Sequence, residues 1–278
     1  MTVNFPHEQN FGELYHRKLC ISDRMMDIRV VLFFIVTTGA GIIVLIERLR
    51  PYTKGQRFFR EGFFNDFVLY SFLQSYGVGV LISFIIELLD GFLSIQPSFM
   101  RSIPVWGQVL IFLITHDFYI YWFHRFQHSS KYFWRIHEAH HSTHDVDWLS
   151  GSRSHSLEIL INQTIEFAPI VILGASPEVA VIKGTIDALW GMYIHSNIDV
   201  HSGFLQLIIN GPEMHRWHHA NDEKVHNKNF STKIALWDWL FGTAYFPKED
   251  KPSGYGLDDN LFPKNYIKQH LYAFRKFD

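Results

Sequence analysis

The sequence has little cysteine and little charge. It contains one cysteine among 278 residues, Cys20, which excludes an internal disulfide, a thiolate metal site and an iron–sulfur cluster. Asp, Glu, Lys and Arg make up 19% of the residues, below the roughly 25% of soluble domains. The net charge of −2 at pH 7 implies neither nucleic acid nor an acidic partner. Any metal must therefore be held by nitrogen and oxygen ligands.

Several redox signatures are missing as well. The sequence has no glycine-rich nucleotide fingerprint, no cysteine cluster and no fused cytochrome-type haem segment. If this chain performs redox chemistry, its electrons must come from a separate donor. There is also no internal repeat, low-complexity tract or linker. We therefore expect one domain over residues 1–278.

Apolar residues take the place of charge. They make up 47% of the sequence, with 26 phenylalanines. A helix needs about 20 consecutive apolar residues to span a bilayer. We predict membrane helices at Val30–Ile46, Phe67–Leu93 and Ile103–Phe123, which together make a membrane region over residues 30–123.

Two later segments, Leu157–Ala175 and Val179–Ile194, are candidates for a membrane hairpin that turns at Pro177. Both carry charges that need internal partners inside a membrane, namely Glu158, Glu166, Lys183 and Asp187. The expected fold is an all-α integral membrane protein with about three to five membrane helices. The alternative is a soluble protein in which the same segments are buried core helices.

Charge on the loops predicts which side the chain faces. The first apolar run begins after a polar segment of 29 residues, and no small-residue cleavage site follows the run, so we interpret it as an anchor and not a removed signal. The connection after that run is basic, whereas the loop between the second and third runs, Ser94–Ser102, contains a single basic residue, Arg101. The positive-inside rule puts the basic loop in the cytoplasm, although the segment 1–29 is basic too. We expect a multi-pass protein, in the inner membrane of a bacterium or the endoplasmic reticulum of a eukaryote.

Histidine is the residue with the most informative pattern. Fourteen of the 17 histidines lie between His116 and His226. Eight form three clusters with spacings of three and four residues: His124 and His128; His137, His140 and His141; His215, His218 and His219. On a helix those spacings put imidazoles on one face, and neutral imidazole is the commonest protein metal ligand. Eight ligands are too many for one ion, so we predict two neighbouring metal ions.

The segments around these clusters resemble those of the membrane fatty acid hydroxylase/sterol desaturase superfamily. The resemblance rests on six stretches: His116–His128, Trp134–Ser142, Arg153–Glu158, Ile194–Asn197, Asn210–His219 and Leu236–Thr243. It implies a catalytic region over 116–243, a tail over 244–278 and a histidine-rich cytoplasmic helical cap on the membrane helices. It also implies that His195 is a ninth metal ligand. His155 is a possible tenth, or it pairs with Glu158 or orients the site from outside.

The resemblance further implies two iron ions per chain that activate dioxygen and attack a C–H bond of a membrane lipid. The lipid is a sterol, fatty acyl chain, ether lipid or carotenoid, and the product is an alcohol or an alkene. Electrons would come from a separate donor of cytochrome b5, ferredoxin or pterin type. Imidazole also suits zinc, copper and nickel, so the spacing alone leaves the metal open and zinc remains possible in isolated protein. No catalytic residue beyond the metal ligands is predicted.

Two other functions remain open. One is a membrane zinc hydrolase, because zinc also takes imidazole and its bound water can attack an ester. The other is a metal-binding protein without catalysis. A further expectation concerns Asp117, which lies two helical turns before His124 and could orient a ligand imidazole.

Overall fold

The structure is a computed structural model that describes residues 8–93, 99–247, 250–257 and 261–276, with side chains from residue 25 onward. Within these residues all regular elements are helices, and the only β-pairing is isolated bridges. The all-helical prediction is therefore confirmed. Residues 1–7 of the predicted amino-terminal segment and residues 94–98 of the loop used to predict sidedness lie outside the described residues.

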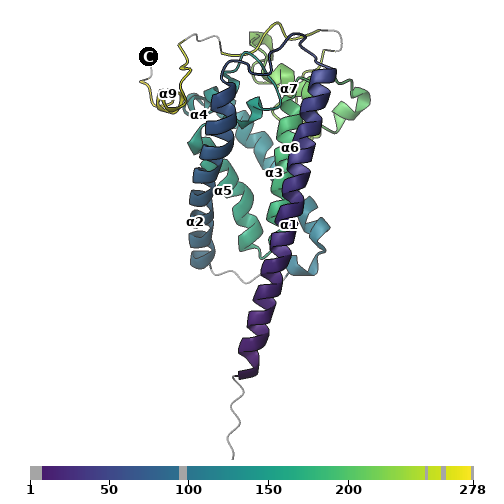
Figure 1. The fold of residues 1–278 in the computed structure, drawn as a ribbon. Helices are drawn as coiled ribbons and strands as arrows, with labels where there is room; N and C mark the ends of the chain where they lie inside the picture. Colours follow the sequence, from purple (N-terminus) through teal and green to yellow (C-terminus); the bar gives the residue numbers. More distant parts are fainter. Residues whose placement is uncertain (1–7, 94–98, 248–249, 258–260, 277–278) are drawn as a thin grey trace, which may run out of the picture.

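Long helices lying side by side form a base, seen in Figure 1 as the tall part of the molecule. They are α1 (Glu8–Leu49), the π-helix η1 (Asn65–Gln74) with α2 (Ser75–Leu93), α3 (Val105–Ser129), α5 (Ser156–Ile172) and α6 (Pro177–His195). Helix α2 packs on α5, and α6 packs on both α1 and α3. An apolar core that includes Phe112, Ile170 and Val179 joins α3, α5 and α6.

The directions of the base helices bring the histidine segments together. Helices α1, α3 and α6 end at the same end of the base, where α5 begins (Figure 1). The first histidine cluster therefore arrives on the last two turns of α3, and His195 is the last residue of α6. Pro177 is the first residue of α6, where its missing N–H costs nothing, and it follows the predicted hairpin turn.

Two helices are long and apolar enough to cross a membrane by length and composition: Met25–Leu49 within α1, and Asn65–Leu93. Within an apolar 18-residue stretch of each span, only 6% of the residues in the first and 11% in the second are buried inside the protein. A core helix of a soluble protein would be mostly buried, so these exposed apolar surfaces favour a membrane protein. The crossing of α3, α5 and α6 remains a prediction.

The charges of the predicted hairpin have the internal partners that a membrane location demands. Lys183 is fully buried and forms ion pairs with Glu166 and Asp187, and it also bonds His116 Nδ1 at 3.2 Å. The other oxygen of Asp187 lies 2.8 Å from Lys233 Nζ. A buried charge without a partner would strongly destabilise the folded protein, and these ion pairs provide the partners.

Shorter helices and loops form a cap on the end of the base where the histidines arrive (Figure 1). They are α4 (Lys131–His141), η3 (Ser150–Ser152), η4 (Gly203–Leu207), α7 (Pro212–His218), η5 (Glu223–Val225), α8 (Leu236–Leu240) and α9 (Tyr266–Tyr272). One further short turn, η2 (Met100–Ser102), precedes α3. The Ser130 side chain accepts a hydrogen bond from Phe133 N and so caps α4 directly after α3 ends.

Candidate metal centre

Nine histidines gather into two adjacent groups where the base meets the cap. The first group is His124, His128, His137, His141 and His218, and the second is His140, His195, His215 and His219. Within each group the candidate ligand nitrogens all lie within 4.8 Å of one another. The groups touch, since the rings of His141 and His219 are 4.6 Å apart. The structure thus brings together the eight clustered histidines and His195.

The HxxHH spacing divides each cluster between the two groups. In α4, His137 and His141 belong to the first group and His140 to the second. In and just after α7, His215 and His219 belong to the second group and His218 to the first. Residues four apart lie on one helix face, whereas the third residue is rotated toward the neighbouring group. Each of these clusters can therefore serve two ions at once.

The nitrogen spacings suit ligands of one ion. His195 Nε2 lies 2.8 Å from His215 Nε2 and 3.2 Å from His140 Nε2, and His219 Nε2 lies 3.1 Å from His215 Nε2. In the first group the Nε2 atoms of His124 and His137 are 3.1 Å apart. Two imidazoles bound at right angles, with metal–nitrogen bonds of about 2.1 Å, place their nitrogens about 3.0 Å apart.

The chemistry of the donor atoms also fits a metal. The Nε2 atoms of His128, His141 and His218 are buried and lack a hydrogen-bond partner, which is rare for buried polar atoms. Burial is the main cause that lowers the pKa of His137 and of His140 to about 3. These imidazoles are therefore neutral at pH 7, which is the form that binds metals.

Outer partners fix the rings of the first group. His137 Nδ1 donates to Glu158 Oε1 at 2.7 Å, and Gln127 donates to the same oxygen at 2.8 Å. His124 Nδ1 lies 2.8 Å from the Phe230 carbonyl, and His218 Nδ1 lies 2.8 Å from the Lys228 carbonyl. With Nδ1 donating outward, the Nε2 lone pair points into the group.

The second group is supported from the other side. His195 Nδ1 lies 2.7 Å from the Gly191 carbonyl, and His140 Nδ1 lies 3.1 Å from the Arg153 carbonyl. The turn before Arg153 packs directly on the His195 ring, because a Cβ added at Gly151 would lie 2.6 Å from His195 Nδ1. The short segment that ends at Arg153 is therefore the wall behind two of the four candidate ligands.

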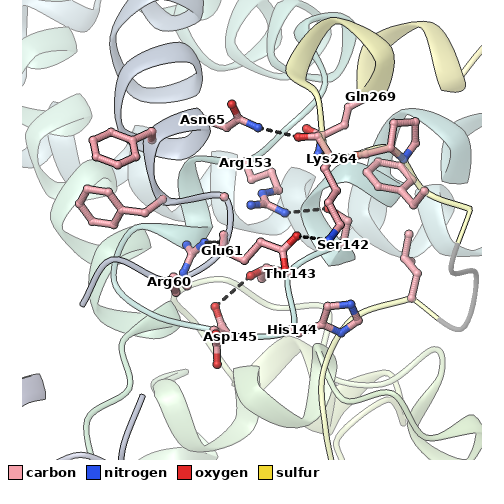
Figure 2. A pocket seen from close by; sticks show the side chains of 16 residues that line it. Arg60, Glu61, Asn65, Ser142, Thr143, His144, Asp145, Arg153, Lys264 and Gln269 are labelled. Atoms are coloured by element: carbon pink, nitrogen blue, oxygen red, sulfur yellow. Dashed lines mark hydrogen bonds and ion pairs between the residues drawn. The ribbon is translucent and has the colours of Figure 1, made fainter. Parts of the chain in front are cut away.

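A buried network of two arginines and two aspartates holds that wall. Asp66 on the π-helix η1 takes two bonds from Arg153, at 2.8 and 3.0 Å. Arg60 binds Asp147 through two bonds of 2.8 Å and reaches Asp66 at 2.8 Å. Arg60 and Arg153 line a cavity of about 570 Å³, in which Figure 2 shows Arg153 reaching toward Ser142. Sequence reasoning missed this network, since its bonded partners Asp66 and Arg153 are 87 residues apart.

Some residues considered from the sequence lie elsewhere. His155 belongs to neither group: its Nδ1 accepts from Leu157 N and caps α5, and its Nε2 lies 3.1 Å from the His270 carbonyl. The structure thus does not support a tenth ligand at His155. Asp117 does not orient an imidazole either, because its carboxylate accepts from Thr232 Oγ1 at 2.8 Å and from Ile234 N at 3.0 Å. Its partners come from a loop more than 100 residues later, which spacing cannot reveal.

A second cavity, of about 520 Å³, reaches the histidine groups from the cap. Its walls include the candidate ligands His128, His141, His218 and His219. Trp134 also lines it and packs on the His128 ring at 5.0 Å. This cavity gives a small molecule a route to both groups.

Comparisons with known proteins agree with this centre. The sequence model of the fatty acid hydroxylase family matches residues 109–243, which contain all nine histidines. The chain is 27% identical to ornithine lipid hydroxylase OlsE of Rhizobium tropici, over 90% of this chain and 78% of that protein. It is 27% identical to human alkylglycerol monooxygenase, over 87% of this chain but 59% of that protein. A very-long-chain aldehyde decarbonylase of Oryza sativa is 30% identical over 51% of this chain and 54% of its own length.

The fold and the histidine groups define a helical protein with a site that can hold metal, and its relatives make it an oxidoreductase. The chain belongs to the membrane fatty acid hydroxylase superfamily, as its motifs suggested. Its named relatives are a lipid hydroxylase, a monooxygenase and an aldehyde decarbonylase. No solved structure matches the chain significantly.

Proposed function

We propose that this protein is a di-iron enzyme that uses dioxygen to oxidise a C–H bond of a membrane lipid. The observation that carries the proposal is the pair of adjacent histidine groups, five and four imidazoles, whose donor nitrogens converge. Catalytic zinc keeps three protein ligands, so nine imidazoles fit a two-ion centre better than a hydrolytic zinc. The nine histidines of the two groups are the proposed ligands.

The chain's own residues would do three things. The histidines would hold two irons, which when bound supply the oxygen chemistry that attacks an unactivated C–H bond. Glu158 and the Arg153 carbonyl would keep His137 and His140 in the tautomer that binds metal. The buried position of the ligands would keep bulk water away from the reacting carbon.

The relatives' names support a lipid substrate. Ornithine lipids and alkylglycerols both have long chains, and exposed apolar helices would keep this enzyme in the layer where such chains lie. We propose that the cap faces the cytoplasm and that electrons arrive there from a separate donor protein or a soluble reductant, because the sequence has no cofactor motif of its own.

The test is a reconstitution. Protein purified in detergent and loaded anaerobically with ferrous iron should retain about two irons per chain. With a reductant and total membrane lipid it should then consume oxygen and yield a lipid heavier by one oxygen or lighter by two hydrogens. His218→Ala should lose iron and product together. Oxygen consumption that requires no lipid would contradict the proposal.

The zinc hydrolase alternative predicts a different result in the same assay. Lipid cleavage that continues without oxygen and depends on zinc would replace the proposal. Two bound irons with no oxidised product from any membrane lipid fraction would instead favour a metal-binding role without catalysis.

A further inference from the structure

In helix η4 of the cap a polar side chain is buried and an aromatic side chain is exposed. Gln206 is 2% exposed, and its amide donates to Glu213 Oε2 at 2.7 Å. Phe204, two residues earlier, is 76% exposed. An element that faces water normally does the reverse, burying its aromatic residue and exposing its amide. The outer surface of η4 therefore suits an apolar environment better than it suits water.

Helix α8 has the same inverted pattern. Asp238 is fully buried and accepts hydrogen bonds from Phe230 N at 2.8 Å and Ser231 N at 2.9 Å. Three apolar residues of α8 are exposed instead, namely Leu236, Trp239 and Leu240, the last to 64%. Two neighbouring elements with buried polar and exposed apolar residues point to one common cause.

The two elements form one surface. Trp239 Nε1 on α8 donates to the Gln206 carbonyl of η4 at 2.9 Å, and Ile209 pairs with Ile234 in a β-bridge. We name this the η4–α8 surface, and its members are each at least 41% exposed: Phe204, Leu205, Leu207, Ile208, Ile209, Leu236, Trp239 and Leu240. Eight large apolar residues gathered on one face exceed what soluble proteins usually expose.

Helix α3 continues this surface along the base. Every fourth residue of α3 is apolar and at least 41% exposed: Trp106, Leu110, Ile114, Phe118, Trp122 and Phe126. Residues four apart are neighbours on a helix surface and each step of four turns by about 40°, so these side chains make a stripe that winds around α3 along nearly its whole length. Phe118 lies 5.0 Å from Trp237, and Trp122 lies 4.9 Å from Phe241. Trp237 and Phe241 are half-buried and adjoin Leu236 and Leu240 of the η4–α8 surface in sequence, so they join the stripe to that surface.

We propose that the η4–α8 surface of the cap is embedded in the interfacial layer of a phospholipid bilayer, beside α3. The occupant is a lipid leaflet and not a protein, because the surface is continuous with the α3 stripe and the stripe extends over the length of the base. Interfacial elements insert apolar side chains and keep their polar groups satisfied, as Gln206 and Asp238 are. Since the stripe extends to Phe126, the lipid head groups reach the height of His124 on the same helix.

The test uses a fluorescent label and needs neither metal nor turnover, so it can fail independently of the proposed function. The single cysteine is replaced by Cys20→Ser, and new cysteines are placed by Phe204→Cys or Leu240→Cys. Each is labelled with a polarity-sensitive fluorophore in vesicles of phosphatidylcholine. The matched control is Glu223→Cys, on the exposed part of the cap helix η5.

Labels at 204 and 240 should emit at shorter wavelength than the label at 223. Nitroxide lipids labelled near the head group should quench them several-fold more strongly than they quench the control. Equal and weak lipid quenching at all three sites would overturn the proposal. A label at 204 or 240 shielded from both lipid nitroxides and aqueous iodide would also overturn it, and would indicate that a second copy of the chain covers the surface.

Discussion

His195 Nε2 lies 2.8 Å from His215 Nε2, although the two residues come from the end of a base helix and from the cap. Through this contact His195, which lies outside the three clusters of the sequence, joins histidines that belong to them. We expect His195→Ala to lose the ion of the second group and to lower activity by roughly 100-fold or more, because second-group ligands would fall from four to three. Metal analysis and a turnover assay measure both. His201→Ala is the control, since His201 is exposed and outside both groups; equal metal content in the two variants would contradict the assignment.

Glu158 acts on the first group through His137. Glu158→Gln removes the charge that orients the His137 imidazole, so metal affinity should fall about 10- to 100-fold. Titration of metal-free protein with ferrous iron measures the change. Glu223→Gln, on the surface of the cap, should bind iron as the wild type does. An unchanged affinity in Glu158→Gln would show that the Glu158 carboxylate does not tune the site.

Asp66 acts on the second group through Arg153. Asp66→Asn weakens the paired hydrogen bonds that hold Arg153, whose carbonyl binds His140. We expect a loss of the second-group ion and a change in the iron spectrum, while Asp66→Glu restores part of both. The control is Glu61→Gln, which breaks an exposed ion pair with Lys264 on the same cavity. Full metal content with a wild-type spectrum in Asp66→Asn would refute the link.

His155 and His270 should make stability depend on pH. Burial lowers the pKa of both side chains below the ordinary value of 6.5. The unfolded chain therefore binds protons as the pH falls through about 6.5, while the folded protein resists them, so stability should fall as pH decreases below that value. Thermal unfolding between pH 7.5 and 5 measures the trend. His155→Asn keeps a capping side chain and should make the profile less steep without abolishing it, because the buried histidines of the two groups keep their own lowered pKa values. A profile as steep as that of the wild type would argue against this source.

Lys183 neutralises the acidic groups inside the base. Lys183→Met leaves Glu166 and Asp187 without this buried cation, which should destabilise the protein by about 3–5 kcal/mol. Thermal unfolding in detergent measures the loss. Lys264→Met, which removes an exposed ion pair, should change the midpoint little. Similar midpoints for both variants would mean that the buried network carries no stability.

Sequence patterns predicted those features of the fold and the site that depend on residues close together in the sequence. The offsets of the histidine clusters gave the ligand candidates, because a spacing of three or four residues fixes neighbours on a helix. The same logic gave the long apolar helices. It did not show that His140 and His218 leave their own clusters for the neighbouring group, since that division depends on how α4 and α7 face each other.

Long-range partners lay beyond such patterns. Asp117 has the right offset from His124 for an outer partner, yet it binds Thr232 in a loop and Trp237 at the start of α8. Asp66 accepts a hydrogen bond from Arg153, which lies 87 residues later, and no residue near either of them in the sequence indicates that the two are paired. The sequence does show that Asp66 is an acidic residue at the start of an apolar segment. That position indicates a need for a partner but does not identify which residue it is.

The division of the HxxHH clusters determines when the centre can form during synthesis. Each group takes ligands from α3 or α6 and from both α4 and the α7 segment. A chain still lacking residues 215–219 therefore has no complete group, however well its earlier helices have formed. Metal loading must follow the packing of the cap on the base, and an unfinished chain that ends before His215 would expose unfilled imidazoles to any metal that reaches them.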